Sequence, residues 1–371
     1  MKDNQLNYNI IYLSDSRNSP TNIPFRIKQS LIRNETNLKV DFLSFNFNGL
    51  SRLLKIILIL ILNNKEYIIH SHHLKSLIIN TIIKFISKLL RQKRIFSYHT
   101  FHCELRRYSR FKLNLIYLSK FLIDDFSCVS ENLKLNWGNF LRQEINFLPI
   151  GISKKEKNII LEKSKEENNN NNNIFPNAME NLIKITWIGR FEKVKNPLLI
   201  LKSLEDIHIK SNKKIEIIFA GDGKLVPIFK KELKSFLDLN IPNIKVKYIG
   251  IQGREEVMNL ISKTNIYINT SSSESFCVSA NEFLCNPFCK LILPNIQNLK
   301  EIYECKRVDF YELSNEKSLR NVIVKNIELF SKKNSKSYQN IYPNNFSSYN
   351  LEETTKRLVN SYISANKNYK Y

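Results

Sequence analysis

Five short apolar runs separated by helical stretches constrain the fold of the second half of the chain more than any other feature. Each run is read as a buried strand, and the five are IKITWIG (183–189), KIEIIFAGDG (214–223), IKVKYIG (244–250), IYINTS (266–271) and KLILP (290–294). Strands that are apolar throughout and joined by helices indicate a parallel sheet covered on both faces. We therefore predict a doubly wound α/β domain over residues 181–345.

The first half of the chain shows the same alternation less regularly, in segments such as KVDFLSF, YIIHSHH, RIFSYHT and INFLPIG. A length of 371 residues also suits two domains. We predict a second doubly wound, Rossmann-like domain over residues 1–152. A charged run at 163–167 is followed by six asparagines at 168–173, and these residues cannot bury apolar area. Residues 153–180 are therefore predicted to form a linker with an Asn-rich loop.

The net charge of +23 is compatible with nucleic acid, an anionic membrane or phosphorylated ligands as partners. No helix-turn-helix, zinc-finger or aromatic-basic RNA motif occurs, so nucleic acid is not an expected partner. The longest apolar run, at 53–62, is shorter than the about 20 residues of a membrane span. The first residues do not resemble a secretory signal, so we expect none and a cytoplasmic protein.

Cysteine and histidine give no clear metal site in the sequence. The six cysteines form no disulfide or zinc pattern, and their expected role is that of small buried side chains. Histidines gather at the ends of two predicted strands, in HSHH (70–73) and YHTFH (98–102). No carboxylate or thiol at short spacing completes a ligand set, so no metal is expected. A histidine such as His99 instead fits a hydrogen-bonding role toward a substrate, or serves as polar filler.

Ligands of doubly wound sheets bind beyond the carboxyl ends of the strands, where two features stand out. Gly189 and Arg190 follow one predicted strand, and Lys195 precedes the next helix. A glycine permits close backbone approach, and two cations near a helix start suit a phosphate. The alternative is an ordinary solvated loop in a lysine-rich protein.

The second feature is a pair of glutamates, Glu274 and Glu282, in SSSESFCVSANEF. Eight helical residues rise roughly 12 Å, about the span of a nucleotide sugar. One carboxylate could hold sugar hydroxyls and the other a ribose, with the helix N-terminus facing a diphosphate. The alternative is a helix-start glutamate and an exposed helical glutamate.

Residues 73–94 predict an amphipathic helix with a strongly basic side, and residues 101–112 add further arginines. A basic amphipathic helix can lie on the anionic inner leaflet of a membrane, where lipid-linked acceptors occur. The alternative is a core helix whose basic face is solvated.

Several segments together resemble, in order and spacing, the donor half of retaining glycosyltransferases of the GT-B fold. The similarity is greatest to glycosyltransferase family 4, the glycosyl transferases group 1. The segments are GRFEKVK (189–195), AGDGKL (220–225), the stretch 248–276 and the pair Glu274-x7-Glu282. YIIHSHH, RIFSYHTFH and INFLPIGIS are similar to strand-end segments in the first half of that family.

The resemblance implies a GT-B architecture in which two Rossmann-like domains face a cleft and a terminal helix at 346–371 crosses back to the first domain. It implies a hexosyltransferase-type enzyme that moves a sugar, with retention, from a nucleotide-diphosphate sugar to a glycan or lipid-linked glycan. The reaction would belong to cell-surface polysaccharide synthesis and would need neither metal nor cofactor. The rivals are a nucleotide-sugar epimerase of the same fold and a non-catalytic or nucleic-acid-binding basic protein.

The resemblance also implies roles for individual residues. Arg190 and Lys195 would grip the donor diphosphate, Glu274 would contact the transferred sugar, and Glu282 would bind the ribose. His99 would lie near the reacting sugar from the acceptor-side domain. The remaining residues assigned to donor binding are Gly189, Phe276, Cys277 and Val278.

The chain departs from the family pattern at positions where glycine is usual. Ser275 and Cys277 follow Glu274, Thr100 follows His99, and 296–298 replaces a glycine pair. Because glycine alone adopts positive φ freely, we expect a changed geometry in the donor loop.

Overall fold

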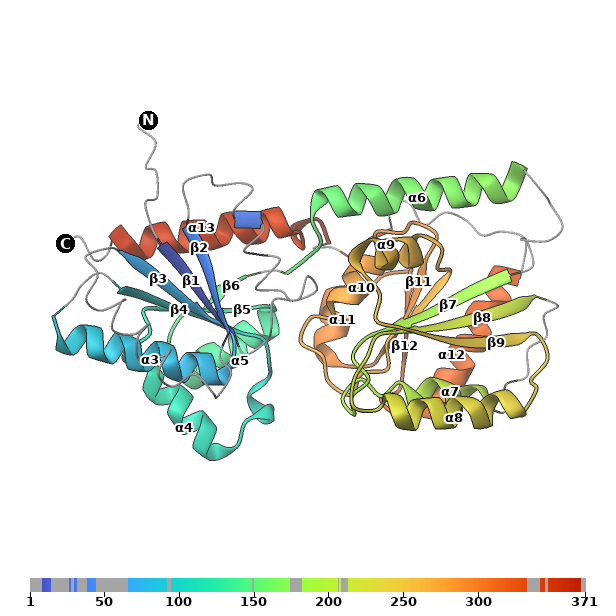
Figure 1. Ribbon diagram of the computed structural model, residues 1–371, viewed down its shortest axis with the longest axis horizontal. Coiled ribbons are helices and arrows are strands. Elements are labelled where there is room, and N and C mark those ends of the chain that lie inside the picture. The colour runs from blue at the N-terminus through green and yellow to red at the C-terminus, as the bar shows by residue number, and fades with distance from the viewer. Residues whose placement is uncertain are drawn as a thin grey trace. The chain divides into compact units, whose positions relative to one another are not determined.

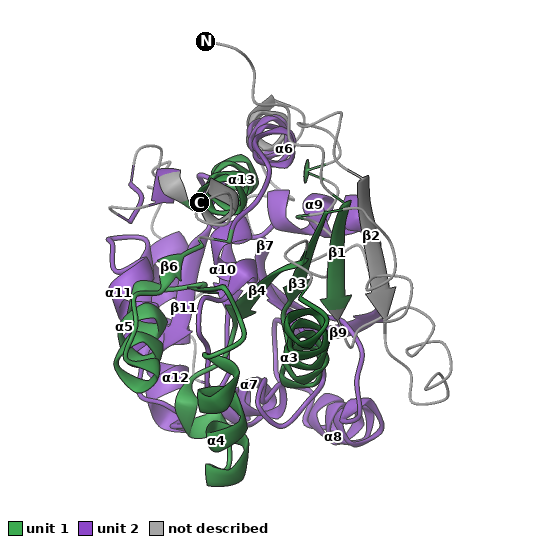
Figure 2. Cartoon of the chain, turned by 90° about the vertical axis from the view of Figure 1, so that its left-hand side faces the viewer, with its two compact units in different colours: residues 1–150, 348–371 green, residues 151–347 purple. Residues whose placement is uncertain are grey.

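The computed structural model describes residues 9–14, 27, 30–31, 39–44, 66–91, 95–148, 150–173, 182–205, 207, 213–331, 341–343 and 346–367. Contacts divide the chain into two units, drawn in different colours in Figure 2. Unit 1 comprises residues 1–150 and 348–371, and unit 2 comprises residues 151–347. Each unit is built on one parallel sheet with helices on its faces (Figure 1). The predicted α/β fold with two doubly wound sheets is therefore confirmed.

The sheet of unit 1 has six strands in the order β2-β1-β3-β4-β5-β6. The strands are β1 (Asn9–Ser14), β2 (Lys39–Ser44), β3 (Tyr67–Ser71), β4 (Ile95–Phe101), β5 (Asp125–Cys128) and β6 (Asn146–Phe147). The helices described in this unit are α3 (Leu74–Leu89), α4 (Arg110–Ser119), α5 (Glu131–Leu141) and α13 (Leu351–Lys367). Short 3₁₀ turns lie at Leu105–Arg107 and Phe346–Ser348.

The sheet of unit 2 also has six strands, in the order β12-β11-β10-β7-β8-β9. The strands are β7 (Leu182–Ile188), β8 (Lys214–Ala220), β9 (Ile244–Gly250), β10 (Ile266–Ile268), β11 (Lys290–Pro294) and β12 (Val308–Tyr311). The helices are α6 (Lys154–Asn173), α7 (Leu198–Leu204), α8 (Val226–Asp238), α9 (Arg254–Ser262), α10 (Val278–Phe283), α11 (Gln297–Tyr303) and α12 (Glu316–Ser331).

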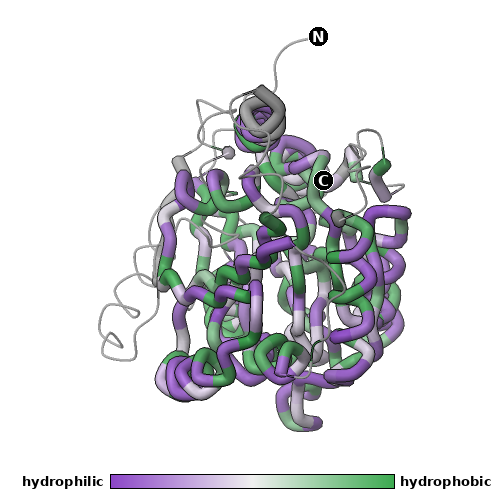
Figure 3. Tube along the Cα trace, turned by 90° about the vertical axis from the view of Figure 1, so that its right-hand side faces the viewer, coloured by the Kyte–Doolittle hydropathy of each residue, from purple (hydrophilic) through white to green (hydrophobic). Residues whose placement is uncertain are grey.

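The core of unit 2 lies between its sheet and the flanking helices. Ile185 and Trp187 of β7, Ile217 of β8 and Ile323 of α12 are all buried in one cluster. Hydrophobic and hydrophilic stretches alternate along the trace, as Figure 3 shows. Strands β10 and β11 are buried along their whole length, as expected where helices cover both faces of a sheet, whereas the edge strand β9 exposes Lys245 and Lys247.

Helix α13 completes the core of unit 1 from the other end of the chain. Its residues Leu358 and Tyr362 are buried in a cluster with Ile10 and Tyr12 of β1. The Tyr362 hydroxyl lies 2.7 Å from His70 Nδ1 of β3. The first sheet is thus covered on this side by residues that follow unit 2 in the sequence.

The Asn-rich segment 168–173 is helical, which corrects the predicted loop, while residues 174–180 of the predicted linker lie outside the described residues. α6 runs from Lys154 through Asn173. Its first turns are anchored, because Ile160 is fully buried and Lys163 donates to Asn259 of α9. Once a helix is nucleated, each further residue adds a hydrogen bond at little cost, so the backbone continues into the asparagines despite their weak propensity.

Candidate functional site

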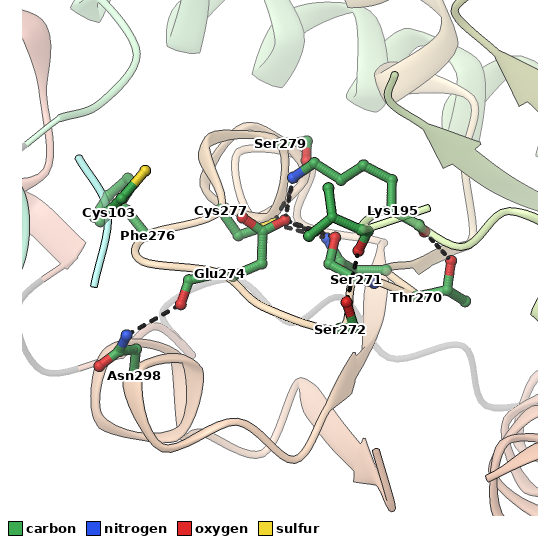
Figure 4. Close-up of polar contacts among 12 residues, drawn as sticks. Cys103, Lys195, Thr270, Ser271, Ser272, Glu274, Phe276, Cys277, Ser279 and Asn298 are labelled. Atoms are coloured by element: carbon green, nitrogen blue, oxygen red, sulfur yellow. Dashed lines mark hydrogen bonds and ion pairs between the residues drawn. The ribbon is translucent and has the colours of Figure 1, made fainter. Parts of the chain in front are cut away.

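Two neighbouring strands of the second sheet bring Lys195 and Glu274 together. Lys195 lies in the loop between β7 and α7, and Glu274 in the loop between β10 and α10. β10 pairs with β7 in the sheet, so both loops leave the same edge. Lys195 Nζ is 2.5 Å from Glu274 Oε1 (Figure 4). A cation and a carboxylate 79 positions apart in sequence therefore form one ion pair.

Several polar groups fix the position of Glu274. Ser271 Oγ donates to Glu274 Oε1 at 2.7 Å, and Asn269 Nδ2 lies 3.3 Å from the same oxygen. Asn298 Nδ2 of α11 donates to the Glu274 carbonyl at 3.0 Å (Figure 4). Asn298 stands in the stretch where the resemblance expects glycine. Its side chain therefore holds the loop from a position where glycine would supply no hydrogen bond.

The loop that carries Lys195 is tied to the loop that carries Glu274. Thr270 Oγ1 donates to the Lys195 carbonyl at 2.8 Å, and the Ser272 amide donates to the Val194 carbonyl at 2.8 Å. Trp187 Nε1 of β7 donates to Thr270 Oγ1 at 2.9 Å. These bonds hold the two loops in register, so the ion pair rests on a fixed backbone.

Arg190 lies apart from this ion pair. Its guanidinium is 70% exposed and pairs with Glu192 at 2.8 Å. The structure thus joins Lys195 with Glu274 but not with Arg190. Packing favours glycine at position 189, because an added Cβ would lie 3.3 Å from the Trp187 ring.

Glycine is required one strand away, in the segment AGDGKL. Gly221 has φ +131°, and a Cβ there would meet the Gly189 carbonyl oxygen at 1.9 Å. Gly223 has φ +152°, and a Cβ there would meet the Phe191 backbone at 2.6–2.9 Å. The close approach of β8 to the 189–191 loop therefore depends on both glycines.

The segment of Phe276, Cys277 and Val278 connects Glu274 to α10. Cys277 adopts φ 58° and ψ 75°, a left-handed conformation, although it is not glycine. The Tyr303 hydroxyl lies 2.6 Å from the Phe276 carbonyl oxygen and 2.8 Å from that of Cys277. The turn predicted to need glycine is thus formed by a cysteine, whose thiol pKa burial raises to about 11.

Helix α10 begins at Val278, so Glu274 lies in the loop before it. The helical rise of roughly 12 Å considered for the two glutamates therefore does not apply to the whole stretch between them. Glu282 lies inside the helix and is buried. With only six helical residues, α10 itself is a weak source of N-terminal charge.

Glu282 is held by an arginine that the sequence analysis did not single out. Arg254 Nη1 at the start of α9 lies 2.9 Å from Glu282 Oε1, and Arg254 Nε donates to Glu156 Oε1 of α6 at 2.7 Å. Burial opposes the charge of Arg254, but the two carboxylates outweigh it and raise its pKa. No local sequence signal connects these three residues, since they come from three helices.

His99 lies in β4 of unit 1, close to His102 and His73. Its Nδ1 lies 2.8 Å from Ser71 Oγ, and its side chain is buried. Burial, followed by the nearby His102 and His73, lowers the pKa of His99 well below its usual value. His70 and His72 are affected in the same way, and the pKa of His102 falls to about 3. These imidazoles are therefore neutral hydrogen-bonding groups at physiological pH.

Among the described residues, no group of three or more His, Cys, Asp or Glu side chains is arranged to hold a metal ion. Within that same part of the chain, no helix combines the length and apolarity that crossing a membrane requires.

Comparison with known proteins places the site inside a recognised family segment. Residues 168–302 match the family of glycosyl transferases group 1. This segment includes Lys195, Glu274 and Glu282. No curated protein matches the chain.

Solved structures resemble the chain over nearly its whole length. Anabaena HepE, crystallised with UDP and glucose, is 12% identical with a TM-score of 0.72, over 96% of this chain and 99% of HepE. Sucrose-phosphate synthase from Thermosynechococcus elongatus is 12% identical with a TM-score of 0.69, over 96% of this chain and 98% of its own. The UDP-forming α,α-trehalose-phosphate synthase from Burkholderia vietnamiensis is 10% identical with a TM-score of 0.65, over 96% and 99%.

At these identities the structures establish the fold, which is the expected GT-B architecture. The family match over residues 168–302 supplies the enzyme class. The expectation of a glycosyltransferase is thereby confirmed.

Proposed function

We propose that the protein is a retaining hexosyltransferase that moves a sugar from a nucleotide-diphosphate sugar to a glycan or lipid-linked glycan in cell-surface polysaccharide synthesis. The observation that carries this proposal is the Lys195–Glu274 ion pair. It lies at the carboxyl ends of β7 and β10, inside the segment that matches the family. Ligands of doubly wound sheets bind at that edge.

Lys195 and Arg190 are the cations proposed for the donor diphosphate. In the structure Glu274 neutralises Lys195, and Glu192 pairs with Arg190. A diphosphate carries more charge than either carboxylate and can take over both cations. Two cations on the leaving phosphate stabilise the charge that develops as the sugar–oxygen bond breaks. On this proposal the reaction uses no metal and no cofactor.

The two glutamates take up the rest of the donor. Once the Lys195 ammonium pairs with the donor phosphate, the Glu274 carboxylate is available to accept hydrogen bonds from hydroxyls of the transferred sugar. Glu282 accepts from the ribose hydroxyls, with Arg254 fixing the direction of its carboxylate. Backbone groups at Gly189 and from Phe276 to Val278 line the same loops. The UDP and UDP-glucose named for HepE crystals support uridine nucleotides as the first candidates.

His99 is proposed to act from the acceptor side. Its neutral imidazole can donate a hydrogen bond to a hydroxyl of the reacting sugar without adding charge near the donor. Retention follows from the resemblance to family 4 and is tested by the anomeric configuration of the product, measured by proton NMR. A lipid-linked acceptor would bring this cytoplasmic enzyme to the inner leaflet of a membrane.

The test of the donor site is thermal stabilisation by UDP-, GDP-, ADP- and CMP-sugars. A donor at 100 times its Kd should add about 2.7 kcal/mol to the free energy of unfolding. We expect one nucleotide family to raise the Tm of the wild type. Lys195→Ala and Glu282→Ala should remove the shift, because each loses a donor contact.

Lys193→Ala is the matched control, since Lys193 is an exposed lysine of the same loop. It should keep the full shift. No shift with any donor, or an equal shift in all variants, would contradict the proposed site. A product that is the isomerised donor, formed without acceptor, would indicate the epimerase instead.

A further inference from the structure

Helix α3 of unit 1 turns polar side chains toward the sheet that it covers. Its buried residues include Ser76, Asn80, Lys84 and Ser87. Lys84 is accounted for, because its Nζ donates to the Ile95 carbonyl at 2.5 Å and pairs with Asp124 Oδ2 at 2.6 Å. A helix that covers a sheet normally buries apolar residues at such positions. The other buried polar side chains therefore need a reason of their own.

Asn80 is fully buried against β3 and β4, which are neighbours in the sheet. Its Nδ2 lies 3.1 Å from the carbonyl oxygens of Ile69 and Tyr98 and 3.1 Å from Ser71 Oγ. Carbonyl oxygens only accept, so the amide group that faces them is the NH₂. Among the described residues, none hydrogen-bonds to the buried Asn80 Oδ1. A buried acceptor without a partner costs stability, so Asn80 is not explained by the stability of the fold alone.

The Ser71 hydroxyl lies between Asn80 and His99. Ser71 Oγ is 2.8 Å from His99 Nδ1 and 3.2 Å from the Tyr98 carbonyl oxygen. A hydroxyl has one hydrogen to donate, which goes either to the imidazole or to the carbonyl. Asn80 already donates to the Tyr98 carbonyl, and hydroxyl donors favour the shorter of the two distances. The Ser71 hydrogen is therefore directed at His99 Nδ1.

The direction of this bond decides which nitrogen of His99 carries a hydrogen. Burial lowers the pKa of His99 well below its usual value, so the neutral imidazole holds a single hydrogen. If Nδ1 accepts from Ser71, that hydrogen lies on Nε2. The Ser71 carbonyl, the smallest influence on the pKa of this ring, favours the opposite tautomer. Within the described part of the chain, Ser71 is the one residue that hydrogen-bonds to the imidazole, so Nε2 is left for a ligand.

We propose that Ser71 and Asn80 are positioning residues that hold the His99 imidazole with its hydrogen on Nε2, from which it donates to a hydroxyl of the reacting sugar. Asn80 occupies the carbonyl that competes for the Ser71 hydrogen, and Ser71 then donates to His99 Nδ1. The identity of the ligand rests on the proposed function, whereas the position of the hydrogen is a property of the free protein. A hydrogen on Nδ1 would instead leave Nε2 as an acceptor, suited to taking a proton from a hydroxyl.

The first experiment is nitrogen-15 NMR of the full chain labelled at histidine. The chain has six histidines, and the signals of His99 are those that a His99→Gln variant lacks. The nitrogen shift distinguishes a ring nitrogen that carries a hydrogen from one that does not. Near neutral pH and without a donor, the wild type should show the hydrogen on Nε2. The hydrogen on Nδ1, or exchange between both nitrogens, would overturn the inference.

Asn80→Leu and Ser71→Ala test the two positioning residues. In Asn80→Leu the Ser71 hydroxyl can turn to the Tyr98 carbonyl, so the hydrogen of His99 should move to Nδ1. Ser71→Ala removes the donor to Nδ1 and should have the same effect. An unchanged tautomer in both variants would overturn the inference. If Asn80→Leu does not fold, Ser71→Ala and the wild-type spectrum decide the question.

Ser97→Ala is the matched control. Ser97 of β4 is also fully buried, but its hydroxyl has no hydrogen-bond partner among the described residues. It should keep the wild-type tautomer of His99. Far-UV circular dichroism and Tm show whether each variant is folded.

The effect on the reaction is measured as sugar release to water from the donor that raises the Tm of the wild type. Ser71→Ala should lower kcat about tenfold, which is the loss of about 1.4 kcal/mol of transition-state stabilisation. KM for the donor should change less than about twofold, because the residues proposed to hold the nucleotide lie in unit 2. A tenfold rise in KM with unchanged kcat, or an equal loss of kcat in Ser97→Ala, would contradict the positioning role.

Failure of this inference is distinguishable from failure of the proposed function. If no nucleotide sugar stabilises the wild type, the proposed function fails, while the tautomer measured without a donor still decides the arrangement of Ser71, Asn80 and His99. If a donor binds but the hydrogen lies on His99 Nδ1, the inference alone fails.

Discussion

Cys277 occupies a backbone conformation that residues with a Cβ adopt at a cost. The left-handed region disfavours an L-residue by about 1–2 kcal/mol. The conformation persists because Tyr303 holds the carbonyls of Phe276 and Cys277, and because Asn269 Nδ2 lies 3.1 Å from the Cys277 Sγ. The loop between the two glutamates thus keeps a glycine-like turn without glycine.

A pair of substitutions at Cys277 tests this account. Cys277→Gly and Cys277→Ala both remove the thiol, but only glycine relieves the backbone. We expect the glycine variant to be more stable than the alanine variant by about 1 kcal/mol, the reverse of their usual order. Urea unfolding of both variants measures the difference. An alanine variant as stable as the glycine variant would show that the turn relaxes in solution.

At the level of elements, α3 owes its orientation to a lysine buried to 3% exposure. Burial lowers the pKa of Lys84, while Asp124 opposes that effect. Removing one partner of a buried pair leaves an uncompensated charge. Lys84→Met should therefore destabilise unit 1 by about 3 kcal/mol or more.

Lys75→Met is the comparison on the same helix, because Lys75 is exposed. It should change the free energy of unfolding by no more than about 0.5 kcal/mol. Chemical unfolding of both variants provides the measurement. If the two variants were equally stable, the ion pair of Lys84 with Asp124 would not set the orientation of α3.

The helices and strands of the chain could be predicted from sequence better than the tertiary contacts that their side chains make. Apolar runs predicted five of the six strands of unit 2, because burial leaves a plain signature. The sixth, the edge strand β12, was not predicted because it has only four residues and carries Asp309. Amphipathicity showed that the helix at 73–94 has two faces, but not that Lys84 and Asn80 turn inward, since their partners lie on other strands. Arg254 was missed for the same reason. The Asn-rich helix was missed because propensity is local, whereas the anchoring of Ile160 is tertiary.

At the scale of the whole molecule, unit 1 buries four neutral histidines that would be protonated at acidic pH in the unfolded chain. In the folded state the pKa of each lies below its unfolded value near 6.5. Above that pH both states are neutral, and stability is unaffected. As pH falls below it, the unfolded state binds protons that the folded state does not, so stability is lost. Burial raises the pKa of Asp125 to about 7, so the folded state binds a proton there as pH falls and gains stability.

The free energy of unfolding of unit 1 should therefore fall by on the order of 3 kcal/mol between pH 6.5 and 5.5. The four histidines lower it, and the single carboxyl of Asp125 offsets part of that loss. Each unit contains one of the two tryptophans, Trp137 and Trp187. A Trp187→Phe variant reports urea unfolding of unit 1 alone, and Trp137→Phe reports unit 2, which should change less. Equal stability of unit 1 at both pH values would mean that the histidines titrate normally.

Because α13 belongs to unit 1, the order in which the ribosome makes the chain differs from the order in which the units are completed. Residues 151–347 all emerge before Leu358 and Tyr362 are added. The growing chain therefore holds every residue of unit 2 while Tyr12 and His70 still lack the helix that covers them. Helix α13, which is translated after all of unit 2, closes the first sheet, and until then this side of the sheet has no covering helix from residues 351–367.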